Sequence, residues 1–355
     1  MARELRRQFQ AVLRRSSDQW RDSWHHADVG NSGLREMTSN GAPVEVPDRK
    51  DTGLLFASEE AVWEVPKPLS TCDVQLDEGT VTTVRQHGNP LGPRLVLSHG
   101  NGLAVDPYFP FWSLLANDFD LMVYDLRNHG SNKVGDQQNH NIPTLISDHD
   151  SILSAVVREY GEKPTVGVFH SFSALISLLS FSDAYSALVL FDPPLCKPTA
   201  SEQEFIQSAE RMAATIRNRT VRFKSEQQFA ELLAIFPGFA RVVPGVRELM
   251  ARSTLRRTAD GEGYELRCPR EYEAQIAEYV RSFSPLLDLT TLTCPTKVIG
   301  ADPTLPSTYL PTFDLGHVSA VDYDFVPEAS HLLQLEQPEQ CAAMLREFLA
   351  GQGIA

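Results

Sequence analysis

Short apolar runs alternate with helical patterns along most of the chain. The runs are rich in β-branched residues, and several are apolar at consecutive positions, as is typical of strands covered on both faces. They lie at 80–86, 94–99, 119–125, 165–170, 187–192, 296–302 and 317–326. Helical patterns occupy 111–118, 147–161 and 339–350. Strand and helix repeated in this way predict right-handed crossovers and an α/β fold with a mostly parallel sheet flanked by helices.

The middle of the chain, 195–290, interrupts this alternation. Apolar residues recur there at helical spacing, and Ser225 and Gln228 fit a capping box before one of the helices. The apolar faces are Phe205, Ala209, Met212 and Ile216; Phe229, Leu232, Leu233 and Phe236; and Tyr272, Ile276, Tyr279 and Phe283. We interpret 195–290 as a helical lid, inserted over the C-terminal edge of a core made of 54–194 and 291–355.

Residues 1–53 have loop composition and too few apolar side chains to bury a core, so they are interpreted as an N-terminal extension. The first twenty residues are rich in arginine and lack the apolar centre of a secretory signal. An organelle-targeting segment is one interpretation. We favour a solvated helical arm with Phe9 and Leu13 on its inner face, which would offer a contact for a homo-oligomer.

Charge and cysteine content narrow the class of protein. The 355 residues include 46 acidic and 32 basic side chains, for a formal charge of −14. Such a surface repels phosphate backbones and anionic lipids, so no nucleic-acid or membrane partner is expected. No run reaches the ~18 apolar residues of a membrane span. The five cysteines are scattered without a CxxC pair, which favours a reducing, cytoplasmic location and predicts no metal site.

Three segments could together form a site for covalent catalysis. LSHGNG (97–102) ends a strand in a small-residue loop, VGVFHSFSALISLL (166–179) joins strand, serine and helix, and PEASHLLQLEQPEQ (327–340) has a histidine between the last strand and the last helix. A serine nucleophile needs a base, a carboxylate that orients the base, and donors for an oxyanion. On these segments the chain resembles the α/β-hydrolase superfamily over roughly 75–350, and especially its lid-bearing esterases and carbon–carbon bond hydrolases.

The resemblance implies Ser171 as the nucleophile and His331 as the base. Ser171 lies where the superfamily has its Gly-x-Ser-x-Gly elbow, and both glycines are replaced here, by Phe169 and Ser173. The small residues of that motif let strand and helix approach closely. Phe169 is therefore the position at which this chain departs most from the pattern.

The resemblance leaves two candidates for the acid. Asp302 follows the strand TKVIG and precedes His331, which preserves the order Ser, Asp, His. Asp192 also ends a strand, and some relatives place the acid there. We expect Asp302 rather than Asp192.

The resemblance also implies an oxyanion hole formed by the backbone N–H groups of Asn101 and Phe172. Gly100 and Gly102 would let the Asn101 loop turn tightly. His99 and His170, which adjoin these loops, are expected to support them, and Asp125 and Arg127 of YDLRNHG are expected to brace the floor of the site.

These features predict a serine hydrolase that cleaves a carboxylic ester or lactone of a small apolar molecule through an acyl-enzyme, without a cofactor. The alternatives are a carbon–carbon bond hydrolase with the same three residues and a ligand receptor that kept the fold without turnover. The small-molecule substrate is the only partner that the motifs imply, apart from a second copy of the chain.

Overall fold

The computed structural model describes residues 62–180, 183–195, 202–305 and 320–354, and within 202–206 the backbone only. The extension 1–53, with Phe9 and Leu13 of the predicted arm, lies outside the described residues.

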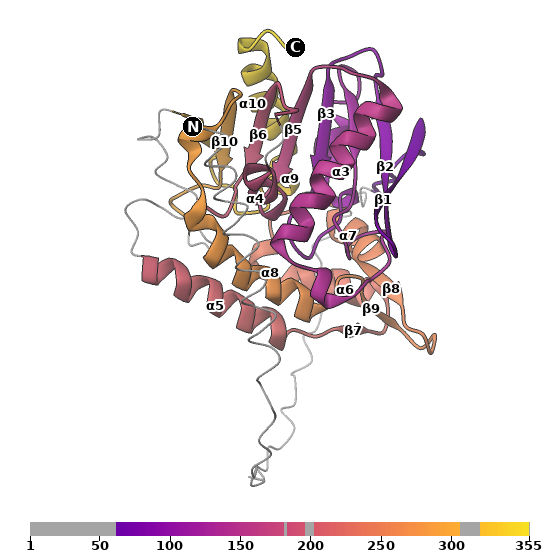
Figure 1. Cartoon of the computed structure of the whole chain (residues 1–355). Coiled ribbons are helices and arrows are strands. Elements are labelled where there is room, and N and C mark those ends of the chain that lie inside the picture. The colour runs from indigo at the N-terminus through magenta and orange to yellow at the C-terminus, as the bar shows by residue number, and fades with distance from the viewer. Residues whose placement is uncertain (1–61, 181–182, 196–201, 306–319, 355) are drawn as a thin grey trace, which may run out of the picture. The chain divides into compact units, whose positions relative to one another are not determined.

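One sheet organises the molecule (Figure 1), with strand order β1-β2-β4-β3-β5-β6-β10-β11. Its strands are β1 (Ser70–Asp77), β2 (Thr80–Gly88), β4 (Asp120–Val123), β3 (Arg94–Ser98), β5 (Thr165–His170), β6 (Ala187–Phe191), β10 (Thr296–Gly300) and β11 (Asp322–Phe325). The pairs β1–β2 and β2–β4 are antiparallel, and all further pairs are parallel. The predicted α/β fold with a mostly parallel sheet is confirmed. The pattern missed β1 because an edge strand with one solvated face has few apolar positions.

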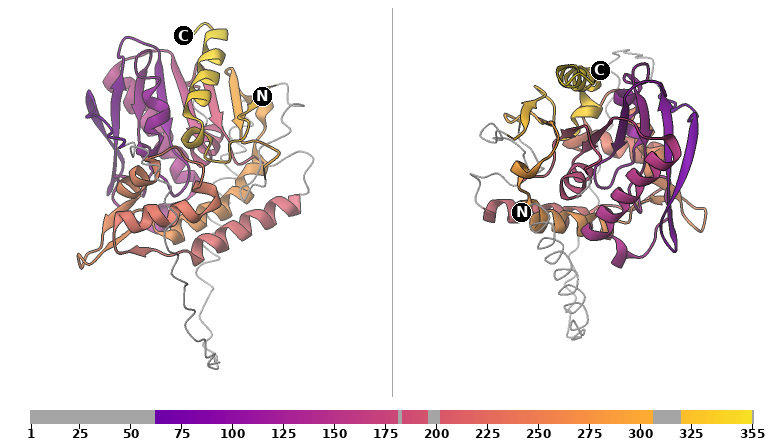
Figure 2. Two further views of the ribbon diagram at one scale, coloured as in Figure 1. Left: turned by 180° about the vertical axis from the view of Figure 1, so that it is seen from behind. Right: turned by 45° about the horizontal axis from the view of Figure 1, so that its top comes forward.

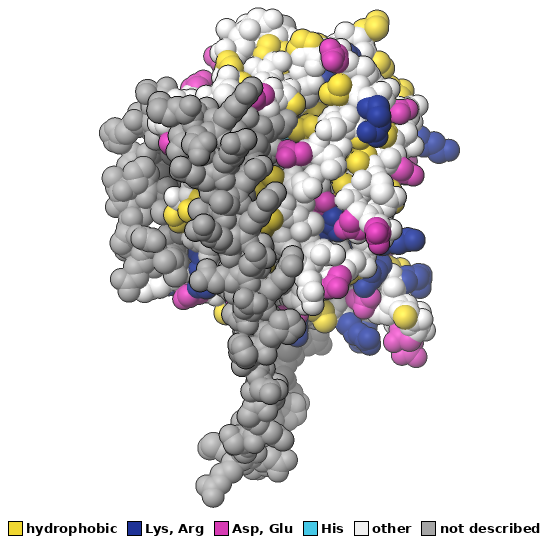
Figure 3. Space-filling model, in the orientation of Figure 1, with side chains coloured by type: hydrophobic (Ala, Val, Ile, Leu, Met, Phe, Trp, Pro, Cys, Tyr) yellow, Lys and Arg dark blue, Asp and Glu magenta, His cyan; other side chains and the backbone are white. Residues whose placement is uncertain are grey.

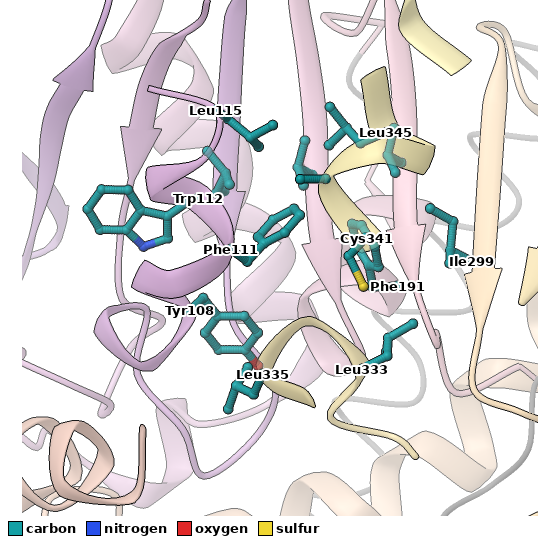
Figure 4. Packing of buried hydrophobic residues seen from close by; sticks show 14 of the residues in the cluster. Tyr108, Phe111, Trp112, Leu115, Phe191, Ile299, Leu333, Leu335, Cys341 and Leu345 are labelled. Carbon is teal, nitrogen blue, oxygen red and sulfur yellow. The ribbon is translucent and has the colours of Figure 1, made fainter. Parts of the chain in front are cut away.

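Helices cover both faces of the sheet, which is why β3, β5 and β6 are buried at every residue. The helices α3 (Ile142–Tyr160) and α4 (Phe172–Leu179) lie on one face, and α2 (Phe109–Ser113) and α10 (Pro338–Gly351) on the other (Figures 1 and 2). The second face holds the main apolar cluster (Figure 4), with Phe111 against Phe191 at 5.3 Å between ring centroids.

The helix α3 begins five residues before the predicted start at 147. Its N-cap is Asn141, whose side chain accepts a hydrogen bond from the Thr144 N–H at 3.0 Å, and a proline follows in the first turn. The start carries the usual signals of a helix N-terminus, an Asn N-cap and a proline in the first turn, and its apolar residues Ile142, Leu145 and Ile146 are buried.

The segment between β6 and β10 forms an insertion, by which we mean residues 202–283. It contains α5 (Glu202–Asn218), α6 (Glu226–Ile235), α7 (Val246–Thr254) and α8 (Arg270–Phe283), in agreement with the helical spacing. A small antiparallel sheet, β7 (Arg222–Phe223), β9 (Tyr264–Leu266) and β8 (Leu255–Arg257), was not predicted because its strands are too short to show a period.

The insertion lies beside the edge at which the parallel strands end (Figure 1). Asn101, three residues after β3, donates a hydrogen bond from Nδ2 to the Glu273 carbonyl of α8 at 2.8 Å. The helices α5 and α8 pack through Ala213, Ala274 and Ala277, small residues that allow close approach. That this insertion acts as a lid stays a prediction.

The described surface carries acidic and basic side chains intermixed (Figure 3). Several of these belong to the insertion, where Arg217 pairs with Glu278 at 2.7 Å and Arg281 with Glu210 at 2.5 Å. Across the described ranges, none of the helices has the length and apolarity needed to span a bilayer.

Candidate active site

Ser171 lies between β5 and α4, with no connecting residue on either side. Its backbone has φ +50° and ψ −113°, a conformation that L residues rarely adopt and that surrounding structure must impose. Its N–H donates to the Phe191 carbonyl of β6 at 2.8 Å, which holds the turn to the sheet. The sharp turn places the Ser171 hydroxyl at the carboxyl end of the sheet, at the start of a helix.

The elbow forms without either glycine of the usual motif. The Phe169 ring is fully buried and packs near Tyr185, with ring centroids 5.9 Å apart. Gly167, two residues earlier on the same face of β5, makes room for that ring, because a Cβ there would lie 2.5 Å from a Phe169 ring carbon. At the other glycine position, the Ser173 hydroxyl donates to the His170 carbonyl at 3.0 Å and accepts from the His170 N–H at 3.1 Å. Both replacements are therefore accommodated.

The structure brings Ser171 and His331 together. Nε2 of His331 lies 2.9 Å from Oγ of Ser171, and Nδ1 lies 2.5 Å from Oδ2 of Asp192. A carboxylate only accepts, so Nδ1 carries the proton, and Nε2, which faces Oγ of Ser171, can accept the serine proton. His331 is 7% exposed and Asp192 2% exposed, so this chain of hydrogen bonds is shielded from water.

The expectation that Asp302 would be the partner of His331 is wrong, because Asp192 occupies that place. The Asp302 carboxylate accepts from the Thr304 N–H at 2.8 Å and from the Glu328 N–H at 2.7 Å. The Thr304 hydroxyl, which donates to Oδ1 at 2.7 Å, and these two backbone donors lower the pKa of Asp302. The bond from Glu328 ties the turn after β10 to the chain just before His331. Asp192 meets the histidine instead because it ends β6, the immediate neighbour of β5, whereas β10 is one strand farther away.

The two amides predicted to form the oxyanion hole come from the loop after β3 and from the start of α4. The N–H of Phe172 belongs to the first residue of α4, where helical geometry supplies no acceptor for it. The Gly100 carbonyl accepts from Nδ1 of His99 at 2.8 Å and from the Leu103 N–H at 3.2 Å. Because the next peptide is trans and planar, the Asn101 N–H points the other way, away from these partners. A Cβ on Gly100 would lie 3.3 Å from Cβ of Ser171, so the loop approaches the elbow closely.

The Asn101 side chain contacts the insertion. Its Nδ2 is bound to the Glu273 carbonyl, and its Oδ1 is buried without a hydrogen-bond partner. The Glu273 carboxylate pairs with Arg219. A Cβ added to Gly102 would lie only 2.5 Å from the carboxylate carbon of Glu273, so only a glycine fits at this contact. The insertion therefore rests directly on the loop of residues 99–102, which we call the oxyanion loop.

Buried neutral histidines support this loop. His99 accepts from the Leu126 N–H at 3.0 Å through Nε2, and His129 accepts from the Gly102 N–H at 3.0 Å. Burial lowers the pKa of both rings, and at His129 the nearby His99 and His140 lower the pKa further, to well below its usual value. Neutral rings can accept at one nitrogen and donate at the other, which a charged ring cannot do.

The loop after β4 braces the floor, as expected from the sequence. Asp125 accepts from the N–H groups of Val105 and Ser131, both at 2.9 Å. Burial alone would raise the pKa of Asp125, but His99, Arg85 and these donors outweigh it and the pKa is lowered. Arg127 binds Asp148 through two nitrogens, each at 2.7 Å.

Sequence reasoning missed Tyr108, whose hydroxyl lies 2.6 Å from Nδ1 of His170 and accepts from the Gly100 N–H. Only its position, a few residues after the His-Gly loop within an apolar run, hints at a role.

No group of His, Cys, Asp or Glu side chains within the described ranges is arranged to hold a metal.

Comparison with known proteins points to one family. The sequence model of the alpha/beta hydrolase family matches residues 95–344. A probable protein phosphatase methylesterase 1 from Caenorhabditis elegans is 27% identical over 172 residues, which cover 46% of this chain and 45% of that protein. This match thus spans less than half of the relative's length.

Solved structures share the fold over about four fifths of the chain. An E-2-(acetamidomethylene)succinate hydrolase has a TM-score of 0.65 at 18% identity, covering 79% of this chain and 99% of that one. An esterase from Thermogutta terrifontis has a TM-score of 0.56 at 19% identity, covering 79% and 98%. At such identities the likeness concerns the fold.

Proposed function

Since the chain belongs to the α/β-hydrolase family, we propose that it is a serine hydrolase that cleaves a carboxylic ester or lactone of a small apolar molecule. The observation that carries this proposal is the continuous chain of hydrogen bonds from Ser171 through His331 to Asp192, at a strained elbow beside a glycine loop. This arrangement supports the roles that we assign, with Ser171 as nucleophile, His331 as base and Asp192 as the carboxylate that orients the base.

The proposed reaction runs in two halves. His331 accepts the Ser171 proton at Nε2 while Oγ attacks the ester carbonyl, and Asp192 stabilises the imidazolium that forms. The N–H groups of Asn101 and Phe172 bind the oxyanion. His331 then protonates the departing alkoxide, leaving an acyl group on Ser171. A water molecule that loses its proton to His331 attacks this acyl group, and the acid is released as Ser171 regains its proton.

An ester is favoured over a carbon–carbon bond by the sequence relative, which is named as a methylesterase. Carbon–carbon bond hydrolysis would use the same three residues and remains the second candidate only through this shared chemistry. A panel of nitrophenyl esters, methyl esters, lactones and vinylogous diketones separates the two reactions by which bond is broken.

The proposal predicts that a fluorophosphonate labels Ser171, because the phosphonate oxygen occupies the same oxyanion hole as the tetrahedral intermediate. Mass spectrometry of the labelled peptide should place the adduct on Ser171. Labelling and ester hydrolysis should vanish in Ser171→Ala and largely vanish in His331→Ala. Ser177→Ala is the matched control, since this buried hydroxyl of α4 donates to the Ala174 carbonyl of its own helix.

A folded wild-type protein with neither label nor hydrolysis, but with measurable binding of apolar ligands, would contradict the enzyme proposal. The chain would then be a receptor built on a hydrolase fold.

A further inference from the structure

A buried set of hydrogen bonds joins the oxyanion loop to the backbone of His331. The Gly100 N–H donates to the Tyr108 hydroxyl at 3.2 Å, that hydroxyl lies 2.6 Å from Nδ1 of His170, and Nε2 of His170 lies 2.8 Å from the His331 carbonyl. Tyr108 is 3% exposed and His170 1%. We call Gly100 N, Tyr108, His170 and the His331 carbonyl the relay.

The direction of every bond in the relay follows from its two ends. Burial lowers the pKa of His170 well below its ordinary value, so the ring is neutral and donates at one nitrogen only. The His331 carbonyl only accepts, so His170 carries its proton on Nε2 and its Nδ1 accepts. The Tyr108 hydroxyl therefore donates to His170, which leaves its oxygen to accept from Gly100. Each hydroxyl or ring thus donates at one side and accepts at the other, an arrangement in which neighbouring bonds strengthen one another.

Close packing accompanies the relay. A Cβ on Gly100 would lie 2.9 Å from Nδ1 of His170, and the rings of His170 and His331 are 4.7 Å apart at their centroids. Tyr108 belongs to the main apolar cluster (Figure 4). The relay therefore connects the oxyanion loop, the residue before the nucleophile, and the residue that would act as base.

We propose that Tyr108 and His170 are positioning residues, which set the distance between the oxyanion loop and His331 on either side of Ser171. This inference rests on the proposed function. Neither residue would touch substrate; they act through Gly100 and through the backbone of His331. Misplacing such groups by about 1 Å can cost on the order of 10²-fold in rate, which gives the relay a measurable consequence.

The test removes one hydroxyl. Tyr108→Phe keeps the ring and its apolar contacts but leaves the Gly100 N–H and His170 Nδ1 without their partner. Tyr185→Phe is the matched control, because the Tyr185 hydroxyl also bonds to a buried histidine, His149 Nε2 at 2.6 Å, outside the relay. We expect kcat for ester hydrolysis to fall about 10- to 100-fold in Tyr108→Phe with KM nearly unchanged, and to stay within about twofold of wild type in Tyr185→Phe.

A second measurement examines the relay without turnover. Nitrogen-15 shifts of the histidine rings at pH 7.5, assigned with His170→Gln, should show His170 protonated at Nε2 only. Protonation at Nδ1, or equal kcat in Tyr108→Phe and wild type, overturns the relay and leaves the proposed function standing. A wild-type protein with neither turnover nor fluorophosphonate label overturns the proposed function, and the relay fails with it.

Discussion

Asp192 and Asp302 both follow strands of the sheet, and both precede His331 in the chain, yet their surroundings differ. Asp192 is buried, with φ +39°, and its N–H donates to the Ile299 carbonyl at 2.8 Å. Its Oδ1 accepts from the Ala301 N–H at 3.3 Å, so the other oxygen is aimed at His331. Asp302 uses its oxygens to cap a turn. At the scale of a single side chain, hydrogen bonds to the backbone therefore decide which of the two carboxylates can bind His331.

We predict that Asp192→Asn lowers kcat by about 10⁴-fold while the protein stays folded, because an amide favours the wrong histidine tautomer. Asp302→Asn should cost less than about tenfold, since an amide oxygen still accepts from the turn. Kinetics of the two variants on one ester, with circular dichroism to verify folding, give the comparison. An equal or larger loss in Asp302→Asn would contradict the assignment of Asp192.

At the scale of elements, the junction of β5 and α4 shows how a strained turn is supported. Every residue of β5 is buried, and the ladder to β6 continues into the N–H of Ser171. The bulk that Phe169 adds to this junction is balanced by the missing side chain at Gly167. The pair conserves volume on one face of the strand, which close-packed cores require.

We predict that Gly167→Ala destabilises the fold by about 1–3 kcal/mol through overpacking against Phe169, Leu188 and Tyr185. In a Phe169→Ala background the added methyl should cost less, giving a coupling of about 0.5–3 kcal/mol between the two sites in urea unfolding. Phe223→Leu, in the separate apolar cluster of the insertion, is the control and should be additive with Gly167→Ala. Additivity of Gly167→Ala and Phe169→Ala would refute the compensation.

At the scale of the whole molecule, buried histidines link stability to pH. Burial lowers the pKa of His149 to about 3, and burial together with Arg127 lowers that of His140 to about 3. The unfolded chain binds protons at these rings from about pH 6.5 downward, while the folded protein does not until about pH 3. Stability is therefore lost as pH falls through this window.

Each such ring contributes a slope of about 1.4 kcal/mol per pH unit to the free energy of unfolding between pH 6 and pH 4. We predict that His140→Gln is less stable than wild type at pH 7, and that its free energy of unfolding changes with pH by about 1.4 kcal/mol per pH unit less than that of wild type. Urea titrations at several pH values measure it, and Ser177→Ala, which removes a hydroxyl that donates to the Ala174 carbonyl, should keep the wild-type slope. An unchanged slope in His140→Gln would show that this ring titrates alike in both states.

Local patterns determined much of this protein. Runs of consecutive apolar residues revealed the parallel strands, and helical spacing revealed the helices between and after them, because both signals lie within neighbouring residues. Ser171 and His331 could be singled out because the short segments that carry them resemble motifs of the α/β-hydrolase superfamily. The edge strand β1 and the short strands of the insertion lack such a signal.

Tertiary structure alone decided the rest. Whether Asp192 or Asp302 meets His331 depends on the order of strands across the sheet, which neither segment contains. The space for the Phe169 ring depends on Gly167 and on Leu188 of β6, which packs against Gly167. Tyr108 reaches His170 only because the loop after β3 folds back on the elbow. These contacts join residues far apart in the chain, and long-range packing, rather than any local preference, determines which of them form.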